Sequence, residues 1–141
     1  MEQKIKIADS NKDILRCFEL MQALRTHLVK DHFVSTVRAM QRDGYHLVYI
    51  EQERDIVALA GYRIYTNLFM GKNLYIDDLV TCESHRSSGL GKRLIDYLRT
   101  TAKSEGCKVL HLDSGTHRGR AHKFYFNQGM TIASYHFSES L

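Results

Sequence analysis

A glycine-rich segment carries the clearest chemical signal in this chain, because it follows a strand-like run and precedes a helix-like one. Its residues are Arg86, Ser87, Ser88, Gly89, Leu90, Gly91 and Lys92. The first N–H groups of a helix lack partners within the helix, so a loop at this point can bind an anion, and the helix dipole adds to the attraction. Neither the P-loop nor the dinucleotide-binding spacing fits, because Arg86 and Leu94 stand where those motifs need glycine.

Positive charge gathers around this segment. The whole chain has 20 Lys+Arg against 16 Asp+Glu, a net charge of +4. Between Ser84 and Phe124 there are nine basic and three acidic residues, a balance of +6, so the remainder carries −2. Such a basic segment favours an anionic partner: a nucleic acid, an acidic surface or a phosphate-bearing cofactor. A solvated basic helix face is the alternative that needs no partner.

Two adjacent aspartates, Asp77 and Asp78, interrupt an apolar strand-like run. Aspartate disfavours strands, so a pair in mid-strand indicates a function. Simple alternation predicts that the two side chains point to opposite faces and that Tyr75 shares the face of Asp77. A carboxylate is a weak base, so Asp77 would act on a substrate proton through water or bind a cationic group directly. Asp78 is a further catalytic candidate, with the anchoring of a loop as its alternative role.

The elements that must position these residues follow from hydrophobic periodicity. Ser10, with Asp13 three residues later, opens a helix whose apolar stripe runs from Ile14 to Leu28. Strands are expected at 4–8, 46–51, 56–65, 74–82, 108–113 and 130–137, further helices at 33–42, 89–105 and 120–128, and a loop at 67–73. A hairpin followed by strand–helix–strand–helix–strand predicts an α/β fold of mixed α+β character, with helices on the faces of a mixed sheet. One domain over residues 1–141 is expected.

Composition excludes several classes of protein. No run approaches the roughly eighteen apolar residues of a membrane span, and charges near the N-terminus argue against a signal peptide. Three cysteines cannot all pair within the chain, so a cytoplasmic, reducing location is expected. His111, His117 and His122 lack metal-site spacing, so no metal is expected. Cys82 lies beside the glycine loop with no partnered histidine expected nearby, so no covalent nucleophile is predicted.

Two motifs in the right order suggest a family. The loop fits the pattern Arg/Gln-x-x-Gly-x-Gly/Ala after a strand, and Ala121-His122-Lys123-Phe124-Tyr125 with Gly129-Met130 fits an Ala-x-x-x-Tyr helix that ends in Gly-Phe/Met. The sequence thereby resembles the GCN5-related N-acetyltransferase (GNAT) superfamily. Residues 113–126 resemble a small bacterial-type subgroup that is distantly similar to aminoalkylphosphonate acetyltransferases. The resemblance implies a mostly antiparallel sheet of six to seven strands, splayed in the middle, with about four helices.

The resemblance also implies roles for individual residues. Acetyl-CoA would lie with its pyrophosphate on the Arg86–Lys92 loop and its pantetheine along the end of the preceding strand. Cofactor-binding residues besides the loop would be Leu79, Val80, Thr81, Arg118, Ala121 and Tyr125. Arg118 departs from the family pattern, since many relatives have asparagine there. Tyr125 would be the general acid that protonates the leaving thiolate, with helix packing as the alternative role for this side chain.

These expectations predict an enzyme that transfers an acetyl group from acetyl-CoA to a primary amine by direct attack in a ternary complex. Candidate acceptor-binding residues are Arg25, His27, His32, Phe33 and Tyr75. Polyamine, aminoglycoside, amino-phosphonate, small metabolite and protein amine all remain open as acceptors, although a small molecule is favoured. A non-catalytic acyl-CoA-binding or sensing module on the same fold is the alternative, and a basic nucleic-acid-binding domain is a less favoured one. Nucleic acid is not an expected partner because aromatics are scarce in the basic segment, and a membrane is not expected because no apolar run is long enough to span one. The short C-terminal region, with room for one strand, predicts a homodimer.

Overall fold

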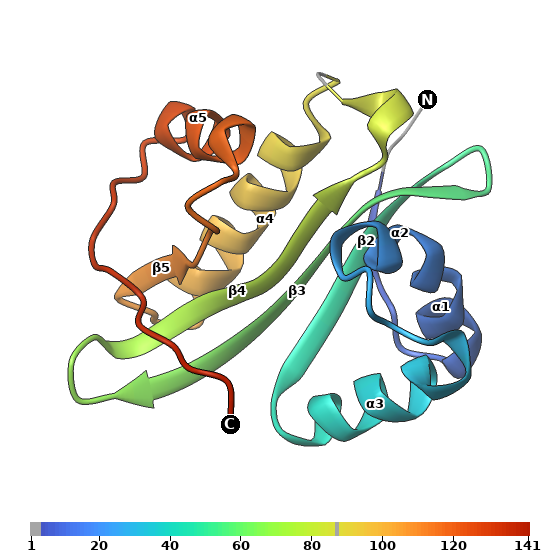
Figure 1. Ribbon diagram of the computed structural model, residues 1–141, viewed down its shortest axis with the longest axis horizontal. Helices are drawn as coiled ribbons and strands as arrows, with labels where there is room; N and C mark the ends of the chain where they lie inside the picture. Colours follow the sequence, from blue (N-terminus) through green and yellow to red (C-terminus); the bar gives the residue numbers. More distant parts are fainter. Residues whose placement is uncertain (1–3, 87) are drawn as a thin grey trace. The chain divides into compact units, whose positions relative to one another are not determined.

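The computed structural model describes residues 4–86 and 88–141, so Ser87 of the predicted loop lies outside the described residues. The chain divides into two compact units, one extending to His111 and the other comprising Leu112–Leu141 (Figure 1). The first unit holds almost all of the sheet and four of the helices. The second holds a single helix and an extended tail.

Five strands form one sheet. They are β1 (Ile5–Ile7), β2 (Tyr45–Gln52), β3 (Asp55–Asn67), β4 (Gly71–Thr81) and β5 (Val109–Leu112), in the spatial order β1-β2-β3-β4-β5. Neighbours from β1 to β4 pair antiparallel. The predicted α/β fold with a mixed, mostly antiparallel sheet is therefore confirmed.

The predicted strand count of six to seven is wrong for the described residues, which form five. The expected last strand, 130–137, is an extended tail without helix or strand. Its residues favour β structure, but a strand needs a paired neighbour as well as propensity. The predicted loop at 67–73 is also largely strand, because Lys72 and Asn73 pair with Thr66 and Tyr65.

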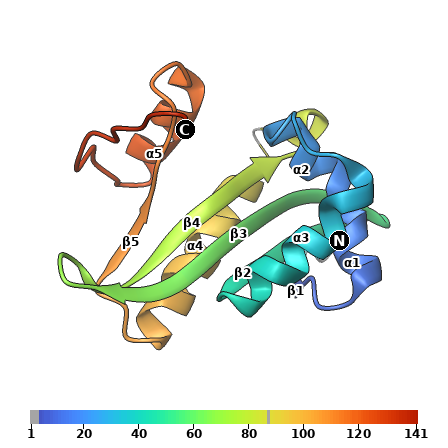
Figure 2. The ribbon, with the colours of Figure 1, turned by 60° about the horizontal axis from the view of Figure 1, so that its bottom comes forward.

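Helices cover both faces of the sheet in the first unit (Figure 2). On one face lie α1 (Asn11–Arg16), α2 (Phe18–Leu24) and α3 (Lys30–Arg42), and on the other lies α4 (Leu90–Ser104). The single helix predicted after Ser10 is broken at Cys17, although the side chain of Ser10 does accept the Asp13 N–H bond expected of a helix cap. The apolar stripe of α4 is buried as predicted; its members are Leu90, Leu94, Ile95, Leu98 and Ala102.

A β-bulge interrupts the pairing of β3 with β4. Gly61 pairs with Asp78 and Tyr62 pairs with Ile76, so Asp77 is an extra residue without a partner in the register. A bulge shifts the alternation of side chains by one position and re-aims those beside it. The prediction that Asp77 and Asp78 point to opposite faces is therefore wrong, as their contacts show.

Candidate active site

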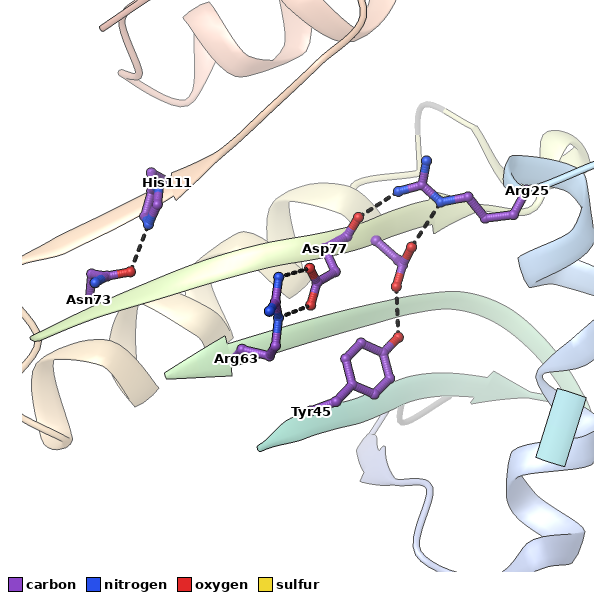
Figure 3. A network of polar contacts seen from close by, with 7 residues as sticks. Arg25, Tyr45, Arg63, Asn73, Asp77 and His111 are labelled. Atoms are coloured by element: carbon purple, nitrogen blue, oxygen red, sulfur yellow. Dashed lines mark hydrogen bonds and ion pairs between the residues drawn. The ribbon is translucent and has the colours of Figure 1, made fainter. Parts of the chain in front are cut away.

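Asp78 is held by two donors on the face of the sheet that packs against α1, α2 and α3. The hydroxyl of Tyr45 donates to Oδ2 at 2.7 Å, and Nε of Arg25, the residue that ends α2, donates to Oδ1 at 3.0 Å (Figure 3). Burial, followed by the charge of Asp78, raises the pKa of Tyr45 well above 10. Both oxygens of Asp78 thus accept internal hydrogen bonds, which anchors β4 to α2.

Gly61 makes the contact between Tyr45 and Asp78 possible. A Cβ atom at position 61 would lie 1.8 Å from the Tyr45 hydroxyl oxygen and 2.4 Å from Cζ, so no side chain fits beneath the tyrosine. The phenol can cross β3 to reach β4 only because this position is glycine.

Asp77 forms a bidentate ion pair with Arg63 on the same face. Nε of Arg63 donates to Oδ2 at 2.9 Å and Nη2 donates to Oδ1 at 2.7 Å, while Nη2 of Arg25 donates to the Asp77 carbonyl at 2.6 Å (Figure 3). Arg63 pairs with Tyr45 on β2 and with Tyr75 on β4, so these three side chains lie on one face of the sheet. Because Asp77 binds Arg63 and Asp78 binds Tyr45, the bulge brings both carboxylates to that face. Arg25 and Arg63 therefore both donate hydrogen bonds to Asp77, the extra residue of the bulge.

Tyr75 continues this polar face toward β5. The Arg63 guanidinium lies 5.6 Å from the centre of the Tyr75 ring. The His111 ring is edge-on to the Tyr75 ring, with 4.9 Å between the two ring centres. Nε2 of His111 lies 2.7 Å from Oδ1 of the buried Asn73, whose amide group donates to two backbone carbonyls. Because Oδ1 is the acceptor, this network assigns the proton to Nε2 of His111.

The glycine loop follows the end of β4 as predicted. Leu79, Val80 and Thr81 pair with β3, a short 3-10 turn η1 (Glu83–His85) comes next, and α4 begins at Leu90. Gly89 is left-handed, with φ of 82°, and a Cβ there would meet nothing within 4 Å. Gly89 is the N-cap and has no side chain that could cap α4, so among the described residues the first N–H groups of this helix suit an anionic ligand such as a pyrophosphate. Arg86 is exposed, whereas Nζ of Lys92 pairs with Asp96 at 2.5 Å.

A histidine does accompany Cys82, which corrects the sequence prediction. Sγ of Cys82 lies 3.2 Å from Oγ of Ser84, which lies 3.0 Å from Nδ1 of His85. Hydrogen bonds from Ser84 and then from His85 lower the pKa of the Cys82 thiol. The three residues come together because the η1 turn folds the segment back on itself. Their closeness in the sequence could have indicated this contact.

The second unit carries the other predicted motif on α5 (Gly119–Asn127). Ala121 and Tyr125 lie on this helix, and Arg118 lies at its N-terminal boundary. Gly129, with φ of 85°, ends the helix, and the Tyr125 carbonyl accepts N–H bonds from Gln128 and Met130. Burial raises the pKa of the Tyr125 phenol, an effect that Arg118 partly opposes.

Within the described residues, the remaining acceptor-binding candidates take no part in the hydrogen bonds of the β4 bulge network. Phe33 is buried in the core, edge-on to Phe18 at 5.3 Å. His27 and His32 are exposed. Arg63, Tyr45 and Gly61 belong to the network but escaped sequence reasoning, since only the strand register brings them to Asp77 and Asp78.

Within residues 4–86 and 88–141, no group of three histidine, cysteine or acidic side chains is arranged to hold a metal ion. In the same ranges, no helix combines the length and apolar character required to cross a membrane.

Comparison with known proteins places these features in a family. Residues 13–130 match the acetyltransferase (GNAT) family. An uncharacterized N-acetyltransferase of Bacillus subtilis (strain 168), YhdJ, is 34% identical over 135 residues, which cover 94% of this chain and 95% of that protein.

Solved structures agree with this assignment. Glucosamine-6-phosphate N-acetyltransferase from Arabidopsis thaliana has a TM-score of 0.79 at 25% identity, covering 99% of both chains. An acetyltransferase of Trypanosoma brucei has a TM-score of 0.82 at 23% identity, covering 99% of this chain and all of that one, and so shares the fold. The chain therefore belongs to the GNAT family and is an N-acetyltransferase of that family.

Proposed function

We propose that this enzyme transfers the acetyl group of acetyl-CoA to the primary amine of a small molecule by direct attack in a ternary complex. The family uses acetyl-CoA as acyl donor. The observation that carries the proposal is the junction of β4 with α4, where the helix starts after the left-handed Gly89 with no cap from that residue's side chain. Those N–H groups fit the pyrophosphate of coenzyme A, with Arg86 adding a full charge. Leu79, Val80 and Thr81 would line the pantetheine.

The acceptor amine must lose a proton before it attacks the thioester. Arg63 occupies both oxygens of Asp77, and Tyr45 and Arg25 occupy those of Asp78. We therefore propose that the proton leaves through water at this polar face, with the aspartates holding that water and the bulge in place. Tyr125 would protonate the departing thiolate, a role that rests on its motif position.

The proposal is tested by measuring thiol release from acetyl-CoA across a panel of amines, with mass spectrometry of the products. We expect acetylation of at least one small primary amine and an intersecting initial-rate pattern, which is diagnostic of a ternary complex. Parallel lines in that pattern, or an acetylated enzyme isolated in the absence of amine, would contradict direct transfer. Binding of acetyl-CoA without any transfer would favour the non-catalytic acyl-CoA-binding module.

We also propose that the chain forms a homodimer. The tail of the second unit exposes large apolar side chains, namely Ile132, Tyr135, Phe137 and Leu141. Exposed apolar surface of this kind favours burial against a partner. Sedimentation at micromolar concentration should give a dimer, and a substitution of Tyr135 and Phe137 by serine should give a monomer; a wild-type monomer would contradict the proposal.

A further inference from the structure

The polar face beside the β4 bulge presents guanidinium groups to solvent and keeps its carboxylates behind them. The side chain of Arg63 is 45% exposed, whereas that of its partner Asp77 is 16% exposed. Arg25 and Asp78 repeat the arrangement, at 44% and 10%. A solute that approaches this face therefore meets two arginines before it meets either acid.

The hydrogen-bond groups still available on this face are guanidinium donors rather than carboxylate acceptors. All four carboxylate oxygens of Asp77 and Asp78 accept a bond from Arg63, Arg25 or Tyr45. Each guanidinium has five N–H donors. Within the described residues, Arg63 donates from Nε and Nη2 only, both toward Asp77, so its Nη1 edge is available to a ligand.

Arg63 is also fixed in position. The bidentate ion pair holds one edge of its guanidinium. The centre of the Tyr75 ring lies 5.6 Å from the central carbon of the guanidinium, and the His111 ring contacts the Tyr75 ring edge-on. A planar donor held in this way loses little conformational entropy on binding a carboxylate or phosphate, which arginine recognises in the same fork geometry.

We propose that Arg63 binds an anionic group of the acyl acceptor, so that the acceptor is a small amine that also carries a phosphate or a carboxylate. The inference rests on the proposed transferase function and narrows its substrate class. Polyamines and aminoglycosides fit poorly, because a polycation would face two exposed guanidinium groups and find both carboxylates already paired. The bulge that carries Asp77 leads directly into the Leu79–Thr81 strand end, so one ligand could place its amine there and its anion on Arg63.

Matched pairs of acceptors test the proposal, each pair differing only in the charged group. Ethanolamine against phosphoethanolamine probes phosphate, 3-aminopropanol against β-alanine probes carboxylate, and putrescine supplies a second cation. We expect kcat/KM for one anionic amine to exceed that of its neutral partner at least about tenfold, chiefly through KM. In Arg63→Gln this ratio should fall about tenfold, and Arg63→Lys should give an intermediate ratio because the charge remains without the fork.

Arg16→Gln is the matched control. Arg16 is likewise ion-paired to a carboxylate, that of Glu51, and lies 5.9 Å from the centre of the Tyr49 ring, yet its hydrogen-bond partners Glu51 and Arg54 are not part of the bulge network. It should leave the anion preference unchanged. Thermal unfolding identifies any variant that fails to fold. If Arg63→Gln does not fold, the ratio of kcat/KM for the anionic and neutral amines in Arg63→Lys decides the test: a ratio equal to that of the wild type would overturn the proposal.

Calorimetric titration of phosphoethanolamine and β-alanine separates this inference from the proposed function. Arg63-dependent binding without acetylation of any amine would contradict the transferase and support the anion site. Acetylation without an anion preference, a preference that survives in Arg63→Gln, or a preference for putrescine would overturn the anion site alone. A loss of acetyl-CoA affinity in Arg63→Gln would assign the arginine to the cofactor instead and would also overturn it.

Discussion

The hydroxyl of Tyr45 reaches across Gly61 and donates to Oδ2 of Asp78 at 2.7 Å. This bond joins β2 to β4 over the intervening strand, and Arg25 completes it from the end of α2. The bulge is therefore fixed from two directions, by a buried phenol and by a half-exposed guanidinium. A site that must hold a strand end and an acceptor in register depends on such support.

Tyr45→Phe should destabilise the protein at neutral pH by about 1–3 kcal/mol, because Asp78 would lose a buried donor. It should also flatten the loss of stability at alkaline pH. The pKa of Tyr45 is raised well above 10 in the folded state, by burial first and then by Asp78. Only the unfolded chain then releases this proton above about pH 10, so the free energy of unfolding falls as pH rises.

Denaturant unfolding of the wild type and of Tyr45→Phe between pH 8 and about pH 11 measures this difference. The variant should keep a residual slope from Cys17 and Tyr62, whose pKa values burial raises to about 12. Equal slopes in the two proteins would show that Tyr45 is not the titrating group.

Gly61→Ala should be severely destabilising and should couple to Tyr45. The new Cβ would lie within 2.6 Å of three atoms of the phenol, so the tyrosine would have to leave Asp78. We expect the free energy of unfolding to fall by about 3 kcal/mol, the size of effect seen for overpacked cores. In a Tyr45→Ala background the same change should cost about 1–3 kcal/mol less, as measured by a double-mutant cycle. Additive effects would mean that the clash is relieved in some other way.

The sequence predicted the elements better than their register. The Ser10 cap, the β2–β3 hairpin and the buried stripe of α4 follow from local patterns that the structure retains. The break at Cys17 was missed because Ile14 and Phe18 keep helical spacing across it, and both are buried as the spacing requires. Apolar periodicity therefore identifies the packed face even where the backbone hydrogen bonds are interrupted.

The bulge could not be predicted in the same way. Alternation assigns Asp77 and Asp78 to opposite faces, and an inserted residue leaves no mark in the composition of a strand. The bulge is revealed only by the strand register, in which Gly61 pairs with Asp78 but Tyr62 pairs with Ile76. Arg63 was missed for the same reason, since 14 residues of sequence separate it from Asp77 and only strand pairing brings them together.

Gly89→Ala should weaken acetyl-CoA binding. Alanine at φ of 82° costs about 1–2 kcal/mol, and the loop would relieve this strain by changing the backbone that presents its N–H groups. We expect KM for acetyl-CoA to rise about tenfold. Gly106→Ala is the matched control, because Gly106 has φ of 77°, lies beyond the other end of α4 and likewise leaves a Cβ without neighbours within 4 Å. Gly106→Ala should lose a similar amount of stability while its KM for acetyl-CoA stays unchanged. If KM for acetyl-CoA changed equally in both variants, the glycine loop would not be part of the cofactor site.

Tyr125→Phe should lower kcat about a hundredfold, the usual effect of removing a general acid. Burial holds the pKa of Tyr125 above 10, so the wild-type phenol stays protonated through neutral and mildly alkaline pH. The alkaline fall of kcat should thus lie above pH 10. Arg118→Gln should move that fall further upward, because Arg118 lowers the pKa. Turnover by Tyr125→Phe that equals the wild type at every pH would exclude the acid role.

Cys82 should react with iodoacetamide faster than Cys17 in the folded protein. Hydrogen bonds from Ser84 and His85 lower its pKa, whereas burial raises the pKa of Cys17 to about 12 and shields that thiol from solvent. The thiolate is the nucleophile, so near pH 7.5 we expect Cys82 to be labelled at least about tenfold faster than Cys17, as measured by peptide mass spectrometry.

Ser84→Ala tests whether the cluster causes that reactivity. The serine contributes the largest lowering of the Cys82 pKa and links the thiol to His85, so its removal should slow labelling and shift the pH midpoint of the rate upward. Ser88→Ala is the matched control, because that hydroxyl donates to the His85 carbonyl and, within the described residues, forms no hydrogen bond with Cys82 or Ser84. If both variants slowed labelling equally, the η1 turn as a whole, rather than the hydrogen bond from Ser84, would set the reactivity of Cys82.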